Sequence, residues 1–183
     1  MRQLKYHEKK LLKKVDFFSW KSEENVREST IIKKYLLQQR EDYVKYNKIV
    51  GNITKLCAKL QGLPPTDELR HQLSVQVLQK LYNMGIVNST SSLSAIEKLS
   101  VSSFCRRRLP VVMVRLKMSE TLKEATTFIE QGHVRVGPNV ITDTAFLVTR
   151  TFEDYVTWVD SSKIKKTIMR YNDKVDDYDL LGN

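Results

Sequence analysis

Basic side chains are concentrated in one stretch in the second half of the chain. Arg106, Arg107 and Arg108 are consecutive, and Arg115 and Lys117 follow with no acidic residue between them. Guanidinium and ammonium groups bind phosphate oxygens, and a guanidinium can do so through two parallel hydrogen bonds. Because three consecutive residues spread over most of the circumference of a helix, we expect at least three of these cations to face solvent or a polyanion.

Two further polar side chains follow this stretch. His133 and Arg135 alternate with Val134 and Val136 directly after Gly132. Successive side chains point to opposite faces of a strand, so a strand here places both polar groups on one face and both valines inward. We expect the polar face to align with the cation cluster. The alternative is that Arg135 is an ordinary exposed strand residue, and His133 taken alone favours that alternative.

The other reactive residues form no catalytic or metal-binding pattern. His7, His71 and His133 have no metal-binding spacing to Cys57 or Cys105, and the two cysteines indicate neither a disulfide nor a zinc site. We find no Gly-rich phosphate loop, Gly-x-Ser-x-Gly motif or Ser/His/Asp constellation. We therefore predict no enzymatic activity, metal, cofactor or small-molecule substrate. Cys57 is expected to be a small buried residue on an apolar helix face.

The chain as a whole is strongly basic. Its 183 residues carry a formal net charge of +10, and the isoelectric point near 9.6 is typical of a protein that binds nucleic acid. A membrane surface would attract the same charge, but no window approaches the roughly 18 uninterrupted apolar residues of a spanning helix. Lys9, Lys10, Lys13 and Lys14 also interrupt any signal-peptide pattern near the start. We expect a cytoplasmic, nuclear or nucleolar protein without a membrane partner.

Residues 1–40 are expected to form a basic helical extension. Apolar residues recur at helical spacing from Leu4 to Trp20, and most lysines lie on other faces. These lysines are Lys5, Lys9, Lys10, Lys13 and Lys14. Two interpretations stay open: an arm that binds RNA or a partner protein, or a helix that packs on its own domain and exposes a basic face. Ser22 to Gln39 is expected to form another helix or an irregular connection.

Residues 41–104 are expected to form a helical scaffold. Apolar residues at three-and-four spacing predict a helix from Glu41 to Leu60, and Gly62 followed by two prolines ends it. Asp67 or Thr66 can cap a second helix, which Gly85 ends. Ser94 to Leu99 is long enough for only one or two helical turns.

Residues 105–160 combine two short helices with a small sheet. Pro110 suits the first turn of one helix, the capping box Thr121-x-x-Glu124 starts the other, and Gly132 ends it. The predicted strands are His133–Val136, Val140–Ile141, Phe146–Val148 and Tyr155–Val159. Residues 161–183 are expected to hold a basic helix, Lys163 to Tyr171, and an acidic tail. The predicted fold class is therefore α+β, with a helical scaffold and an αα-hairpin on a small, mainly antiparallel sheet.

The sequence resembles a known family. Arg107-Arg108-Leu109, the predicted hairpin and Gly132-His133-Val134-Arg135-Val136 resemble the S4-type RNA-binding domain, over roughly Cys105 to Val159. Leu4 to Phe17 and Cys105 to Pro110 resemble one family of Imp-type proteins of the U3 small nucleolar ribonucleoprotein, and this resemblance extends over nearly the full chain. That family is similar to ribosomal protein S4 along most of its length. Pro110 and the Gly137-Pro138-Asn139 turn depart from the usual S4 pattern.

The resemblance implies a nucleolar, non-catalytic RNA-binding protein of the small-subunit processome in the nucleus. Such a protein would bind U3 snoRNA and promote its pairing with pre-rRNA for early 18S rRNA processing, beside other processome proteins of Mpp and Imp type. Carried over by position, the RNA-facing residues would be Arg106, Arg107, Arg108, Arg115, Lys117, His133 and Arg135. The alternatives are a small-subunit ribosomal protein of the S4 family and an interaction scaffold whose basic surface binds an acidic partner protein.

Overall fold

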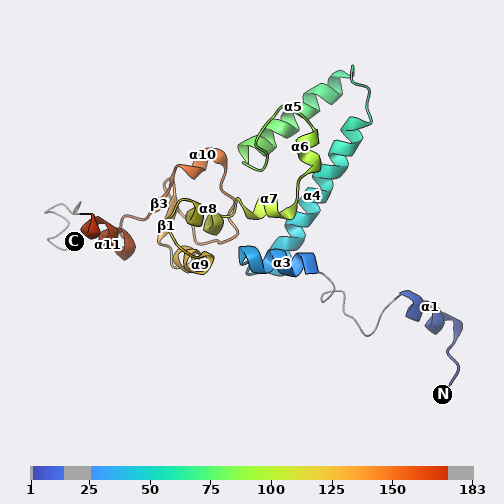
Figure 1. Ribbon diagram of the computed structural model, residues 1–183, viewed down its shortest axis with the longest axis horizontal. Coiled ribbons are helices and arrows are strands. Elements are labelled where there is room, and N and C mark those ends of the chain that lie inside the picture. The colour runs from blue at the N-terminus through green and yellow to red at the C-terminus, as the bar shows by residue number, and fades with distance from the viewer. Residues whose placement is uncertain (1, 15–25, 173–183) are drawn as a thin grey trace.

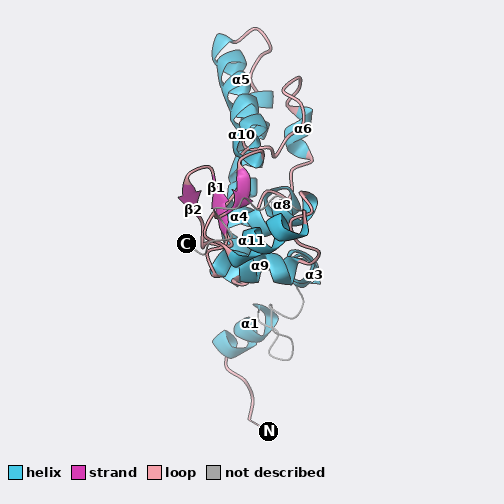
Figure 2. Ribbon diagram, turned by 90° about the vertical axis from the view of Figure 1, so that its left-hand side faces the viewer, coloured by secondary structure: helices cyan, strands magenta, loops and turns pink. Residues whose placement is uncertain are grey.

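The molecule is an α+β protein in which a helical part leads into a hairpin of helices on a three-stranded sheet (Figures 1 and 2). The computed structural model describes residues 2–14 and 26–172. The helical part consists of α1 (Tyr6–Lys14), α3 (Val26–Tyr35), α4 (Arg40–Gln61), α5 (Glu68–Asn83), α6 (Ser94–Glu97) and α7 (Val101–Cys105). The rest consists of α8 (Leu109–Arg115), α9 (Leu122–Glu130), β1 (Val134–Val136), β2 (Asn139–Val140), α10 (Arg150–Glu153), β3 (Val156–Trp158) and α11 (Lys163–Tyr171).

The two long helices, α4 and α5, end where the sequence predicts. After α4 the backbone N–H of Gly62 donates to the carbonyl of Ala58, and the two prolines that follow cannot continue the helix. The side chain of Asp67 caps α5 by accepting from the N–H of Leu69. Gly85 follows α5 in the left-handed conformation, with φ of +72°. The turn that joins the two helices points away from the sheet (Figure 1).

Two buried clusters stabilise the helical part. One lies where α3, α4 and α7 meet, and the other lies where α4, α5 and α6 meet. Cys57 is buried in the second cluster, which confirms its predicted place on an apolar helix face. Tyr46 on α4 stacks on Phe104 of α7, with ring centroids 5.9 Å apart. The scaffold is thus fixed directly to the segment that enters the hairpin.

The hairpin packs on the sheet through a third buried cluster. Its fully buried members come from α8, α9, β1 and the segment after β2: Leu109, Val112, Met113, Ala125, Ile129, Val134 and Val148. The capping box of α9 is present, since Thr121 Oγ1 accepts from the N–H of Glu124 and a Glu124 carboxylate oxygen accepts from the N–H of Thr121. Pro110 lies in the first turn of α8. The predicted hairpin is confirmed.

The sheet is antiparallel, with strand order β2-β1-β3. On β1, Arg135 lies opposite Val140 on one side and Thr157 on the other. Val134 and Val136 are buried, whereas Arg135 is half-buried, so the predicted alternation is confirmed.

One predicted strand is wrong. Phe146 to Val148 forms no strand, and only Leu147 makes a bridge, to Arg108. The N–H of Leu109 donates to the Phe146 carbonyl and the N–H of Val148 donates to the Arg107 carbonyl. This segment therefore pairs with the turn before α8 instead of joining the sheet. The sequence also did not predict α10, which follows it directly.

The N-terminal and C-terminal predictions are described only in part. Of the helix predicted from Leu4 to Trp20, the described portion is α1, none of whose residues is buried. Figure 1 shows α1 apart from the rest of the fold. Residues 15–20 and the acidic tail from Asp173 to Asp179 lie outside the described residues. The predicted basic helix at Lys163 to Tyr171 is confirmed as α11.

Candidate nucleic-acid interface

Three of the predicted RNA-facing cations are exposed, two on the hairpin and one just before it. Arg106 follows α7, Arg115 ends α8, and Lys117 lies in the turn between α8 and α9. Within residues 2–14 and 26–172, neither Arg106 nor Lys117 has an ion-pair partner. Both charges are therefore available to an external anion.

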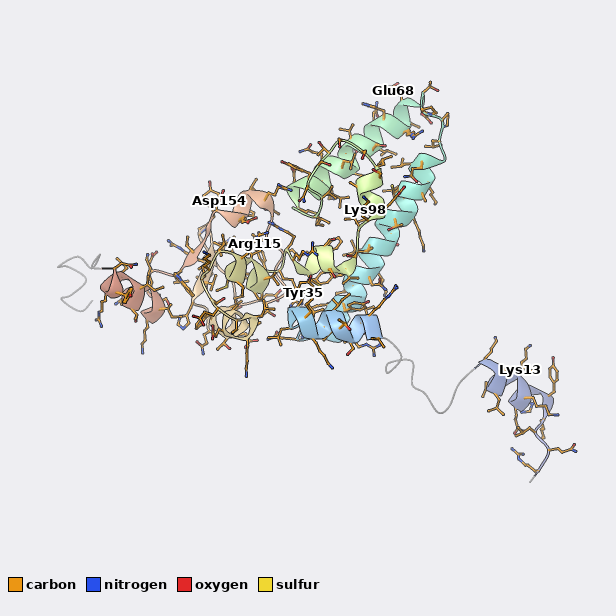
Figure 3. All side chains as sticks on the ribbon, viewed as in Figure 1. Lys13, Tyr35, Glu68, Lys98, Arg115 and Asp154 are labelled. Atoms are coloured by element: carbon orange, nitrogen blue, oxygen red, sulfur yellow. The ribbon has the colours of Figure 1, made fainter. Side chains whose placement is uncertain are left out.

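Arg115 is exposed but already paired. Its guanidinium donates to Glu153 at the end of α10, and the labelled Arg115 lies on α8 beside α10 (Figure 3). About half of the side chain remains open to water, with an exposed fraction of 49%. An ion pair at such an exposed site contributes about 0–1 kcal/mol, so a phosphate can compete with Glu153 for this cation.

Lys117 adopts a backbone conformation that favours glycine. Its φ is +59°. The N–H of Met118 donates to the Met113 carbonyl, and the N–H of Lys117 donates to the Val114 carbonyl, which is the Schellman arrangement at a helix C-terminus. A residue with a Cβ costs about 1 kcal/mol in this conformation. The charged side chain therefore occupies the tip of the turn despite a cost to the fold.

Arg107 is not a surface cation, contrary to the expectation from the sequence. Only 6% of the residue is exposed. Its guanidinium donates twice to the Val148 carbonyl, at 2.9 and 2.7 Å from Nε and Nη2, and once to Glu153, at 2.9 Å from Nη1. It also lies directly beneath Gly85, where a Cβ would approach the Arg107 Cζ to 2.7 Å.

Arg108 is buried even more completely, with 2% of the residue exposed. Its Nε donates to the Thr144 carbonyl at 3.2 Å, and its Nη1 lies 3.6 Å from a carboxylate oxygen of Asp42 on α4. The prediction that Arg107 and Arg108 face the RNA is therefore corrected: both guanidiniums are used inside the protein.

The reason for this burial lies far along the chain from the arginines. The segment from Thr144 to Val148 leaves carbonyl groups without sheet partners, and buried carbonyls need donors. Asp42 and Glu153 add carboxylates that are also distant in sequence. No acidic residue lies near the three arginines in the sequence, and the sequence therefore predicted a single surface cluster.

Two other side chains beside Arg108 are held neutral by burial. Burial raises the pKa of the Tyr46 hydroxyl to about 12 and that of the Cys105 thiol to about 11. A protonated thiol is neither a nucleophile nor a metal ligand.

Within the part of the chain that the structure describes, no group of His, Cys, Asp or Glu side chains could hold a metal ion. No helix among these residues is long and apolar enough to cross a membrane.

Arg135 lies on β1 and His133 directly precedes this strand, and both form contacts with the chain around α11. Arg135 donates from Nε to Thr157 Oγ1, at 3.1 Å, and from Nη1 to Asp160, at 2.6 Å. The Nδ1 atom of His133 lies 3.1 Å from Ser162 Oγ. These two residues therefore contact β3 and the segment before α11, whereas Arg115 contacts Glu153 on α10.

The sequence did not single out the acidic residues that organise these cations. Glu153 pairs with both Arg107 and Arg115, and Asp160 pairs with both Arg135 and Lys165. Hydrogen bonding from Lys165, with the charges of Lys165 and Arg135, lowers the pKa of Asp160 and keeps it ionised. A further exposed cation, Lys123, lies in the first turn of α9. Its position in the sequence did not indicate that it belongs with Arg106, Arg107 and Arg108.

Two family models together match most of the chain. The ribosomal protein S4/S9 N-terminal domain matches residues 3–106, and the S4 domain matches residues 107–153. The two matches meet in the turn between α7 and α8.

Similar proteins match over almost the whole length. The chain is 57% identical over 181 residues to the U3 small nucleolar ribonucleoprotein protein IMP3 of Saccharomyces cerevisiae, covering 98% of this chain and 99% of that protein. The human protein of the same name is 50% identical over 181 residues, with 98% of each chain covered. A small ribosomal subunit protein uS4 from Sulfolobus acidocaldarius is 27% identical over 141 residues, covering 76% of this chain and 79% of that protein.

Proposed function

The chain belongs to the IMP3 family of U3 small nucleolar ribonucleoprotein proteins, and we propose that it is an RNA-binding component of that particle which acts in ribosomal RNA processing. The observation that carries this proposal is the match of 57% identity across nearly the full length of both chains. The ribosomal alternative is weaker, because the uS4 proteins are far less similar and match a smaller share of the chain.

The exposed cations of the hairpin support binding to the RNA backbone. Arg106, Arg115 and Lys117 are exposed, and no apolar pocket for a base is needed to use them. The deep major groove of an A-form helix excludes side chains, so structured RNA is recognised largely through shape, phosphates and ribose hydroxyls. The hairpin thus positions the protein on a folded RNA through phosphate contacts.

The finer assignments extend this proposal. The RNA partners are U3 snoRNA and pre-rRNA, and the protein promotes their pairing without catalysing a reaction itself. Its protein neighbours are other processome components of Mpp and Imp type, in the nucleolus. The net charge of +10 supports this role, because a polycation reduces the repulsion between two RNA strands that must pair.

The proposal is tested by measuring the affinity of the full-length chain for transcribed U3 RNA over a series of salt concentrations. Arg106→Gln with Lys117→Gln, termed the hairpin pair, removes two exposed charges. Each lost phosphate contact makes the slope of log affinity against log salt less steep by about 0.7–0.9, so we expect a change of about 1.4–1.8.

The matched control is Lys55→Gln with Lys59→Gln, which removes two exposed lysines from α4. The control should keep the parent slope. If the parent chain binds U3 RNA no better than an unrelated structured RNA of equal length, the assignment to U3 RNA is wrong. If both pairs reduce the slope equally, the hairpin is not the contact surface.

A further inference from the structure

Helix α11 carries a row of positive charge outside the residues that match the S4 domain. That match ends at residue 153, and α11 follows β3 at the far end of the molecule from α4 and α5 (Figure 1). Lys163, Lys166 and Arg170 are exposed and stand at positions i, i+3 and i+7, so they share one face of the helix. At 1.5 Å per residue, this row is about 10 Å long.

No acidic residue lies within this helix or its capping segment. Residues 161–172 contain three lysines and one arginine but no aspartate or glutamate. The more apolar side chains Ile164, Ile168 and Tyr171 fall on a different face from the cation row, at positions i, i+4 and i+7. None of the helix residues is buried, so the basic row is not explained by packing within the described residues.

The start of α11 is fixed to the sheet. Ser162 is buried, with 4% of the residue exposed. Its hydroxyl oxygen lies 3.1 Å from His133 Nδ1 and accepts a hydrogen bond from the N–H of Ile164. The N–H of Val159 donates to the His133 carbonyl at 2.9 Å, which extends the pairing of β3 with β1. These contacts set the direction in which the cation row leaves the sheet.

A carboxylate joins the row to the strand. Asp160 pairs with Arg135 on β1 and with Lys165 on α11. Both cations keep about a third of their side chains exposed. The surface defined by Arg135, Lys163, Lys165, Lys166 and Arg170 is termed the α11 face, and Asp160 pairs with two of its five cations.

We propose that the α11 face is a second binding site for the RNA phosphate backbone, separate from the hairpin. The inference rests on the proposed function, because it assumes that RNA is the polyanion. Phosphodiesters supply one charge per nucleotide at regular spacing, which suits a row of cations. An acidic protein segment is a poorer fit, because the cations stand on a different face of α11 from the exposed apolar side chains Ile168 and Tyr171, and burial of apolar surface contributes most to protein association.

The test uses the full-length chain, transcribed U3 RNA and three double variants. Lys163→Gln with Arg170→Gln, termed the α11 pair, removes two charges from the row, and glutamine keeps a helix propensity close to that of lysine. It is compared with the hairpin pair and with the Lys55→Gln, Lys59→Gln control. Circular dichroism checks that α11 is retained.

We expect the α11 pair to make the salt slope less steep by about 1.4–1.8, as the hairpin pair does, and the two changes to add when combined. If the α11 pair keeps the parent affinity and slope while the hairpin pair loses both, the inference is overturned and the proposed function stands. If the α11 pair binds U3 RNA normally but recovers fewer processome proteins from cell extract, the face binds protein and the inference is again overturned. A parent chain that does not prefer U3 RNA overturns the proposed function.

A second variant should act in the opposite direction. Asp160→Asn removes the carboxylate that competes with phosphates for Arg135 and Lys165, so we expect tighter RNA binding and a steeper salt slope. The control is Glu41→Gln, which removes an exposed carboxylate from α4. An affinity equal to that of this control would contradict an RNA contact at the α11 face.

Discussion

Arg106, Arg107 and Arg108 are identical and consecutive, yet they have three different environments. Arg106 is exposed, Arg107 holds a backbone carbonyl and Glu153, and Arg108 lies beside Asp42. The distinction matters because a buried guanidinium that has a partner contributes to the fold, whereas an exposed one is free to bind phosphate. A variant that replaces all three at once cannot separate the two effects.

Arg108→Ala is expected to destabilise the protein. The substitution leaves the buried Asp42 carboxylate and the Thr144 carbonyl without the guanidinium. Breaking a buried pair by removing one partner costs about 3 kcal/mol or more. Urea denaturation would measure the free energy of unfolding. Arg106→Ala is the neighbouring control and should stay within about 0.5 kcal/mol of the parent; a similar loss in both variants would argue against a special role for Arg108.

Lys117→Gly should separate stability from RNA binding. Glycine relieves the left-handed strain of about 1 kcal/mol, and part of this gain is offset by the greater freedom of glycine in the unfolded chain, so we expect a net gain of about 0.5 kcal/mol. The lost charge should make the salt slope for U3 RNA less steep by about 0.7–0.9.

Lys117→Ala is the matched control, because it removes the charge and keeps the strain. It should show the same change in salt slope without the gain in stability. A thermal midpoint that rises equally in both variants would mean that the strain at this turn is not what limits stability.

The helices that form the core differ from α1 and α11 in how much they bury. The helices α8 and α9 supply most of the buried cluster against the sheet, whereas α1 and α11 contribute no buried residue. Both α1 and α11 are basic and amphipathic. Such helices are stabilised mainly by what they contact, because short isolated helices are marginal in water.

Deleting residues 1–20 is expected to weaken assembly into the particle more than RNA binding by the isolated chain. Removing α1 takes no side chain from a buried cluster, and its exposed Leu11 and Leu12 offer apolar surface that RNA backbone does not need. Recovery of processome proteins from extract and a mobility-shift assay with U3 RNA would measure the two effects. Equal losses would show that Lys5, Lys9, Lys10, Lys13 and Lys14 belong to the RNA site.

At the scale of the whole molecule, arginines connect the scaffold to the sheet-bearing part. Arg150 on α10 donates to the carbonyls of Tyr82 and Val87, at 2.9 and 3.0 Å, and its guanidinium lies 4.1 Å from the centre of the Tyr82 ring. Arg107 lies beneath Gly85, just after the same helix. The C-terminal end of α5 is thus held by two guanidiniums from the part that carries the RNA surface.

Arg150→Ala should loosen this connection and lower the free energy of unfolding by about 2–3 kcal/mol, from the loss of two charge-assisted hydrogen bonds and the ring contact. Chemical denaturation followed by far-UV circular dichroism would measure it. Lys80→Ala, an exposed position on α5, is the control and should change little. A normal stability in the Arg150 variant would show that Arg150 is not needed to hold the two parts together.

Features that depend on neighbouring residues could be predicted from the order of the amino acids. The capping box of α9, the ends of α4 and α5, the proline in α8 and the alternation of β1 all follow from local hydrogen bonding and periodicity, and the structure confirms them. The sequence also indicated the S4 family, through motifs that lie close together along the chain.

Which cations stay at the surface depends on long-range contacts in the folded chain. Arg107 and Arg108 are buried because acidic side chains and backbone carbonyls from distant segments pair with them. The segment that supplies these carbonyls pairs with the turn before α8, so it forms a single bridge where a strand was predicted. Arg135, in contrast, is joined to α11 by Asp160. Burial of a charge depends on partners that folding brings together, so no local pattern can report it.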